Sequence, residues 1–69
     1  MTELSDAAVE RIIKKAGAYR ISSDATETLA VLMEEYGEHI AKEAKKMSDH
    51  AGRKTVRGSD IQMAAEFFK

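Results

Sequence analysis

Residues 23–51 read SDATETLAVLMEEYGEHIAKEAKKMSDHA, and this stretch decides the fold of the chain. At 3.6 residues per turn, its apolar side chains fall on one stripe and most charged side chains fall opposite. The stripe comprises Ala25, Leu29, Leu32, Met33, Tyr36, Ile40, Ala44, Met47 and Ala51. Ser22 or Ser23 can cap the start of this helix, and Gly52 can end it. The pattern predicts one helix of about 28 residues, roughly 42 Å long.

A shorter helix is predicted before the long one. Ser5 can serve as its N-cap, with Asp6 in the first turn. The apolar side chains that recur at helical spacing are Val9, Ile12, Ile13 and Ala16. Gly17 stands where a left-handed residue would end the helix, which we expect to span about 6–16.

A third helix is predicted after a second connector that contains Thr55 and Val56. Ser59 and Gln62 fit a capping box at its start, although a start one or two residues earlier also fits. Its inner stripe is expected to comprise Ile61, Ala64, Ala65 and Phe68. The side chains expected on its outer side are Asp60, Met63 and Phe67. An outward methionine and phenylalanine are unusual for a surface that only meets water.

Length and composition limit the protein class. The chain has 69 residues, a formal net charge of −1, no cysteine and no proline. The lack of cysteine excludes a disulfide framework and a thiolate metal site. No apolar run approaches the roughly 20 residues that span a bilayer, and nothing resembles a signal peptide. We expect one domain, residues 1–69, in a soluble cytoplasmic protein that does not engage a membrane.

The sequence contains no recognisable catalytic arrangement. No nucleophile lies beside a base in a known motif, and the four glycines form no phosphate-binding loop. His39 and His50 would stand about 16 Å apart on one helix, too far to share a metal ion. The side chains at i, i+4 spacing around His39 could hold a surface metal, but solvated side chains are the commoner reason for such spacing. We predict no catalytic residue, no cofactor and no metal.

Basic residues are segregated along the chain although the net charge is slightly negative. The stretch 11–20 carries four cations and no acid, and 45–57 carries five cations against Asp49 alone. These clusters lie at helix ends and in connectors, where backbone N–H groups can also meet phosphate. This distribution favours a polyanion as partner. The candidate contacts are Arg11, Lys14, Lys15, Arg20, Arg53, Lys54, Thr55 and Arg57.

The length of the central helix predicts a dimer. Two short helices of about 15 Å each cannot cover an apolar stripe of about 42 Å. A second copy could cover the remainder if the two long helices crossed about a twofold axis, which would make folding and dimerisation one event. The predicted dimer core comprises Leu29, Leu32, Met33, Tyr36 and Ile40. The alternative is a monomeric three-helix bundle, whose helices are usually similar in length.

Two motifs resemble those of archaeal histones. The first is KKAGAYRIS at residues 14–22, and the second is HAGRKTVR at residues 50–57, followed by Asp60-Ile61. The resemblance covers essentially the whole length. It implies the all-α histone fold, in which short helix, loop, long helix, loop and short helix form a handshake dimer. It also implies a chromatin protein of the nucleoid that binds, bends and compacts double-stranded DNA without sequence specificity, as dimers that assemble into tetramers or filaments.

The resemblance further implies roles for single residues. Arg11, Lys14, Lys54 and Thr55 are similar to the family's phosphate contacts, and Arg20 is similar to an arginine inserted toward the minor groove. Arg53 and Asp60 would form a salt bridge that braces the second loop. Gly17 would let stacked layers approach, and His50 would donate to Asp60 of a neighbouring dimer. The implied dimer–dimer interface comprises Met47, His50, Asp60 and Met63.

The acidic balance leaves a second interpretation open. A net charge of −1 predicts weaker DNA binding than a basic histone would show. The alternative is a histone-fold variant that acts mainly as a heterodimer with a more basic paralogous histone, or that caps filaments. Native mass spectrometry of a mixture with such a partner would separate the two interpretations.

Overall fold

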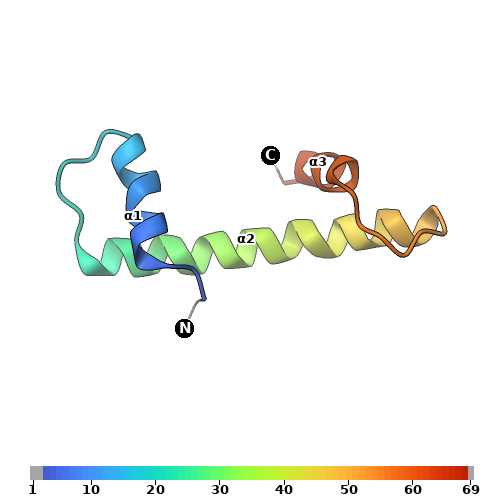
Figure 1. The fold of residues 1–69 in the computed structure, drawn as a ribbon, viewed down its shortest axis with the longest axis horizontal. Helices are drawn as coiled ribbons and strands as arrows, with labels where there is room; N and C mark the ends of the chain where they lie inside the picture. The colour runs from blue at the N-terminus through green and yellow to red at the C-terminus, as the bar shows by residue number, and fades with distance from the viewer. Residues whose placement is uncertain (1–2, 69) are drawn as a thin grey trace. The chain divides into compact units, whose positions relative to one another are not determined.

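The computed structural model describes residues 3–68 and contains three α-helices. These are α1 (Asp6–Lys15), α2 (Ser23–His50) and α3 (Gly58–Glu66), joined by two short connectors (Figure 1). No β-strand occurs within residues 3–68, so the all-α prediction is confirmed. The contacts of the chain form two compact units, Met1–Glu35 and Tyr36–Lys69.

In the first unit, α1 begins and ends where local chemistry predicted. Ser5 is its N-cap, and the Ser5 hydroxyl accepts a hydrogen bond from the backbone N–H of Ala8 at 3.0 Å. Gly17 follows the last turn with a φ of +104°, and its N–H donates to the carbonyl of Lys14 at 2.9 Å. A residue without a Cβ adopts this left-handed conformation at little cost, which explains the glycine.

Small side chains make the interior of the first unit. Val9 of α1 is 1% exposed, and Thr26 and Ala30 of α2 are 3% and 1% exposed. The Ser22 hydroxyl accepts a hydrogen bond from the N–H of Ala25 at 3.3 Å, so Ser22 caps α2. In Figure 1, α1 lies across the first part of α2, which agrees with the burial of Val9.

In the second unit, α2 ends in a Schellman motif. Gly52 has a φ of +70°, its N–H donates to the carbonyl of Asp49 at 3.0 Å, and the Arg53 N–H donates to the carbonyl of Ser48 at 3.0 Å. The interior of this unit again consists of small side chains. Ala44 and Ala64 are fully buried, and Ser48 is 2% exposed.

The helix α3 begins two residues before the Ser59–Gln62 capping box would place it, which agrees with the earlier start that the sequence also allowed. Its N-cap is Arg57, and the Asp60 carboxylate at the N3 position accepts the Arg57 N–H at 2.8 Å. Asp60 is 4% exposed, so the expectation that it faces outward is wrong. Its carboxylate turns inward because donors from the connector surround it.

Large apolar side chains remain exposed in both units. Leu32 is 54% exposed in the first unit, whereas Tyr36 and Met63 are 47% and 62% exposed in the second. Val31 of α2 is also exposed, at 41%. Two predicted members of the inner stripe of α3, Ile61 and Phe68, are also exposed, at 39% and 37%. Within its described residues, one copy of the chain therefore leaves much of the predicted apolar stripe uncovered.

Candidate functional site

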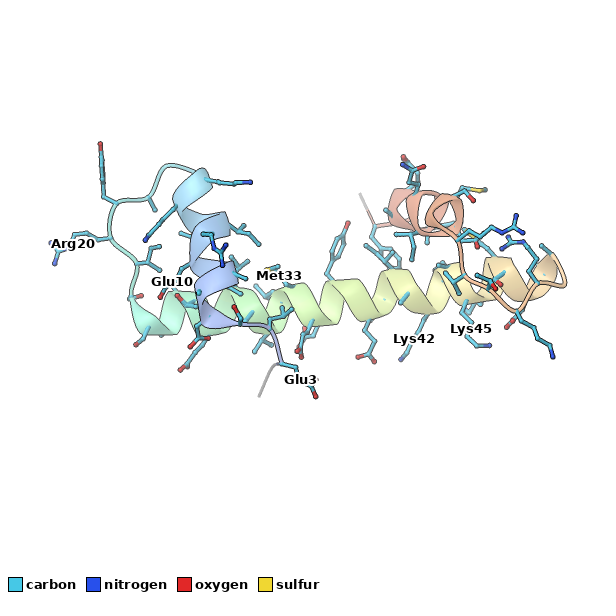
Figure 2. All side chains as sticks on the ribbon, viewed as in Figure 1. Glu3, Glu10, Arg20, Met33, Lys42 and Lys45 are labelled. Carbon is cyan, nitrogen blue, oxygen red and sulfur yellow. The ribbon has the colours of Figure 1, made fainter. Side chains whose placement is uncertain are left out.

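The cations at the end of α1 and in the first connector are free. Lys14, Lys15 and Arg20 are exposed, and none of them forms an ion pair with any residue between 3 and 68. Arg11 is also exposed, and within residues 3–68 its one hydrogen bond is from Nε to the carbonyl of Ala7, at 3.4 Å. Figure 2 shows the Arg20 side chain extending from the connector, away from α1. These charges are available to an anionic partner.

The lysines on the exposed side of α2 are partly neutralised by neighbouring acids. Lys42 pairs with Glu38 at 3.3 Å, Lys45 with Asp49 at 2.8 Å, and Lys46 with Glu43 at 3.6 Å. Exposed pairs of this kind add little stability, but they reduce the local positive potential. Lys42 and Lys45 project from the side of α2 away from α3 (Figure 2). Within residues 3–68, the cations of the stretch 45–57 therefore divide into ion-paired residues, namely the lysines of α2 and Arg53, and two connector residues without an ion pair, Lys54 and Arg57.

Arg53 and Asp60 form a bidentate ion pair across the second connector. The two guanidinium nitrogens of Arg53 donate to the two carboxylate oxygens of Asp60 at 2.9 and 2.8 Å. One of these nitrogens also donates to the carbonyl of Thr55 at 2.9 Å. The hydrogen bond from Arg53, followed by that from the Arg57 N–H, lowers the pKa of Asp60 to about 2. The same carboxylate hydrogen bond raises the pKa of Arg53.

This geometry divides the predicted contacts of the second connector into two groups. The Arg53 side chain is 24% exposed and its guanidinium is held by Asp60, which suits a bracing role better than a phosphate contact. Lys54, Thr55 and Arg57 are exposed, and no residue between 3 and 68 forms an ion pair with Lys54 or Arg57. The roles of all four in binding stay predictions.

Ser48 is a structural residue of this site that the sequence pattern did not single out. Its hydroxyl lies 3.0 Å from the carbonyl oxygen of Arg53 and 3.1 Å from that of Thr55, so its single proton is shared between them. The side chain is buried at the end of α2 and connects that helix to the second connector. The sequence could have indicated a buried Ser48, because it lies four residues after Ala44 and therefore on the same face of the helix.

The residues of the predicted dimer–dimer interface line an open groove of about 660 Å³ in the second unit. Met47 is half-buried, whereas His50 is exposed and Met63 is 62% exposed. Phe67, which was not among the predicted interface residues, also lines the groove and is 67% exposed. Among the described residues, the groove is lined by Glu43, Lys46, Met47, Asp49, His50, Arg53, Asp60, Met63 and Phe67.

The predicted dimer core is only partly covered. Leu29 and Met33 in the first unit and Ile40 in the second are half-buried, whereas Leu32 and Tyr36 are about half exposed. The Tyr36 ring meets the Phe68 ring edge-on, with centroids 6.2 Å apart, and His39 lies 6.0 Å from the same ring.

Gly17, predicted to permit layer stacking, has open space where a Cβ would lie, because no described atom beyond its chain neighbours is within 4 Å of that position. Its positive φ is explained by the end of α1, so the stacking role stays a prediction. The described residues hold no group of three or more acidic or histidine side chains that could bind a metal. Among the helices of residues 3–68, none is long and apolar enough to cross a membrane.

Comparison with known proteins gives concordant matches. A family model described as histone-like transcription factor (CBF/NF-Y) and archaeal histone matches residues 2–65. The chain is 46% identical over 66 residues to one subunit of the archaeal histone HAN1 of Thermococcus zilligii, covering 96% of this chain and 98% of the relative. It is 42% identical over 64 residues to probable archaeal histone 3 of Methanocaldococcus jannaschii, covering 93% and 96%.

Proposed function

Because this chain belongs to the family of histone-like transcription factors (CBF/NF-Y) and archaeal histones, we propose that it binds, bends and compacts double-stranded DNA without sequence specificity. Proteins of this family are structural DNA-binding proteins with the histone fold, so the chain is not an enzyme. The observation that carries the proposal is the exposed, unpaired set of cations at the end of α1 and in the two connectors. The proposed location is the chromosome, in the cytoplasm.

We propose that residues 1–69 form a single histone-fold domain and that two copies of the chain pair as a handshake dimer. Each half of the chain is too small to bury a sufficient core of its own, because chains below about 40 residues rarely fold without a staple or a partner. The half-exposed Leu32 and Tyr36 supply apolar surface for a second copy. Leu29, Met33 and Ile40 would complete this interface, and the two copies would fold together.

In such a dimer, antiparallel long helices bring the first connector of one copy near the second connector of the other. Lys14, Lys15 and Arg20 would then share a patch with the partner's Lys54, and Thr55 and Arg57 would extend it. Binding would neutralise phosphates and release counterions, so affinity should fall steeply with salt. Sequence preference would follow the ease of bending the DNA rather than contacts to base edges.

Assembly beyond the dimer would use the groove lined by Met47, His50, Met63 and Phe67. The exposed Met63 and Phe67 offer apolar surface to a second dimer. A bond from His50 to Asp60 of the neighbouring dimer must use the little surface that Asp60 still exposes, because Arg53 and the Arg57 N–H already donate to both carboxylate oxygens. Gly17 would let successive layers of a filament approach closely.

The test of the DNA interface is a pair of double variants with equal charge change. Arg20→Ala/Lys54→Ala removes one free cation from each connector, whereas Lys42→Ala/Lys45→Ala removes two paired lysines from α2. We expect the first variant to bind duplex DNA more weakly, with a log–log salt slope that falls by about 0.9 for each phosphate that is no longer neutralised. The second variant should stay near the wild type. Gel-shift titrations at several salt concentrations would measure both, and equal affinities would refute these contacts.

A heterodimeric role is the second candidate. One relative is named as a subunit of the histone HAN1, and the net charge of this chain is −1. Pairing with a more basic paralogue would supply the positive charge that this chain lacks. Light scattering of the isolated protein, followed by native mass spectrometry after mixing with a paralogue, would test this candidate. A stable homodimer that shifts DNA alone and exchanges no protomers would exclude it.

A further inference from the structure

Tyr19 is exposed far beyond what its chemistry favours. Its side chain is 99% exposed, whereas the other tyrosine, Tyr36, is 47% exposed and contacts the Phe68 ring. Tyrosine usually buries much of its ring, so full exposure leaves a large apolar surface in water without benefit to this fold. We infer that Tyr19 is a DNA contact in its own right, with its ring against the sugar edge of the duplex beside Arg20. This inference rests on the proposed function.

The surroundings of Tyr19 are basic and contain no acid. Tyr19 lies in the first connector, directly before Arg20, and no aspartate or glutamate occurs from Arg11 to Ser23. The exposed Lys14 and Lys15 lie a few residues before it and have no ion-pair partner in the described part of the chain. An anionic partner is therefore attracted to the segment that carries the ring.

The first connector carries two apolar side chains of different exposure. Ile21 is half-buried, while Tyr19 and Arg20 on its N-terminal side are exposed. Fixing Ile21 limits how far its neighbours can move, which reduces the entropic cost when they bind a partner. A duplex offers both surfaces that such a pair needs, because its phosphates attract the guanidinium and its deoxyribose rings present apolar edges.

The contribution of the ring should differ in kind from that of the cations. Counterion release makes the cationic contribution sensitive to salt, whereas burial of an aromatic ring releases no counterions. Because the net charge of the chain is −1, the salt-sensitive contribution of its cations to the binding free energy is limited. An apolar contact would therefore sustain DNA binding at moderate salt. Tyr19→Ala should lower DNA affinity at least about fivefold without changing the log–log salt slope. Tyr19→Phe should retain most of the affinity, and Arg20→Ala should reduce the slope.

The composition of the chain permits a direct optical test. It has no tryptophan and two tyrosines, so Tyr36→Phe leaves Tyr19 as the only tyrosine fluorophore. Duplex DNA should change the Tyr19 emission, corrected for DNA absorbance, at the same concentrations that give the first gel shift. The Tyr19→Phe single variant, whose only tyrosine is Tyr36, is the matched control and should respond much less. Circular dichroism would verify that each variant folds.

The possible outcomes separate this inference from the proposed function. Weaker binding by Tyr19→Ala with an unchanged salt slope, together with a Tyr19 emission response, would support it. Wild-type affinity of Tyr19→Ala would overturn the inference, although salt-sensitive shifts by the wild type would still support the proposed function. An effect limited to later steps of assembly would also overturn it, because Tyr19 would then contact another protein molecule. The absence of any shift by the wild type at low salt would refute the proposed function itself.

Discussion

Ser48→Ala should destabilise the second unit by loosening the connector from α2. The buried hydroxyl shares its proton between the carbonyls of Arg53 and Thr55, at 3.0 and 3.1 Å. The Thr55 carbonyl keeps a donor in the variant, because the Arg53 guanidinium also reaches it at 2.9 Å. The Arg53 carbonyl loses its side-chain donor, so the cost should correspond to one hydrogen bond, about 1 kcal/mol per chain. Alanine recovers part of this cost, about 0.5 kcal/mol, through its higher helix propensity.

The matched control is Ser59→Ala, which makes the same chemical change at an exposed position of α3. The net cost of Ser48→Ala is therefore about 0.5–1 kcal/mol per chain, and 1 kcal/mol shifts the melting temperature of a small domain by about 4–8 °C. We expect Ser48→Ala to melt roughly 2–8 °C below this control. Both proteins must be compared at one concentration, since a dimer melts at a concentration-dependent temperature. Amide exchange should accelerate at Arg53, whose N–H donates to the Ser48 carbonyl. Melting temperatures within about 1 °C of each other and unchanged exchange at Arg53 would refute the reasoning.

Three further predictions address acid stability, the dimer and the middle of α2. The pKa of Asp60 is about 2 in the folded chain against an ordinary 3.8, so its stabilisation is present above about pH 4 and is lost as the pH falls toward 2. Urea unfolding midpoints between pH 2 and 5 should therefore vary less in Asp60→Asn than in the wild type, and equal variation would contradict the pairing. Leu32→Lys should raise the dimer dissociation constant more than about 100-fold, because two leucines lose about 3 kcal/mol or more of burial. Val31→Lys should have little effect, and equal light-scattering masses for the two variants would count against the proposed core. Gly37→Ala should lower the melting temperature, because the added methyl group would collide with a partner helix that crosses there. If no helix crosses there, the substitution should instead stabilise the protein by about 1 kcal/mol through the higher helix propensity of alanine, and the melting temperature should rise.

Local sequence chemistry predicted the helix boundaries well. Ser5 and Ser22 act as N-caps, and Gly17 and Gly52 adopt the left-handed conformations that end α1 and α2. Each of these features depends on one side chain and a few neighbouring backbone groups, so sequence spacing is sufficient to predict it. The all-α fold and the family followed from the same pattern together with the two motifs.

Of the two starts that the sequence allowed for α3, the earlier one is confirmed and the Ser59–Gln62 capping box is not, because a more distant contact decides between them. Ser59 and Gln62 fit a capping box by spacing, and Asp60 looked like an outward residue of the helix. In the structure, the carboxylate of Asp60 faces the guanidinium of Arg53, seven residues earlier, and accepts the Arg57 N–H. Periodicity alone cannot identify such a pair, because its partners lie on different elements, and the Arg53–Asp60 salt bridge was predicted only from the resemblance to archaeal histones. Ser48 was missed for the same reason, since its acceptors belong to the connector rather than to α2.

The small and the large apolar side chains along α2 differ in burial, and this difference explains why the chain would pair with a second copy. In each half of the helix, small residues such as Ala30 and Ala44 are buried within their own unit, where a short helix covers them. The larger Leu32 and Tyr36 stay half exposed, although burial would stabilise each by about 2 kcal/mol. Gly37 adds a further unexplained cost, because glycine inside a helix is unfavourable, and a Cβ there would have no other described atom within 4 Å beyond its chain neighbours and the adjacent backbone of α2. A partner helix that crosses near the middle of α2 would account for both costs, since it would cover the large side chains and approach closest where the side chain is absent.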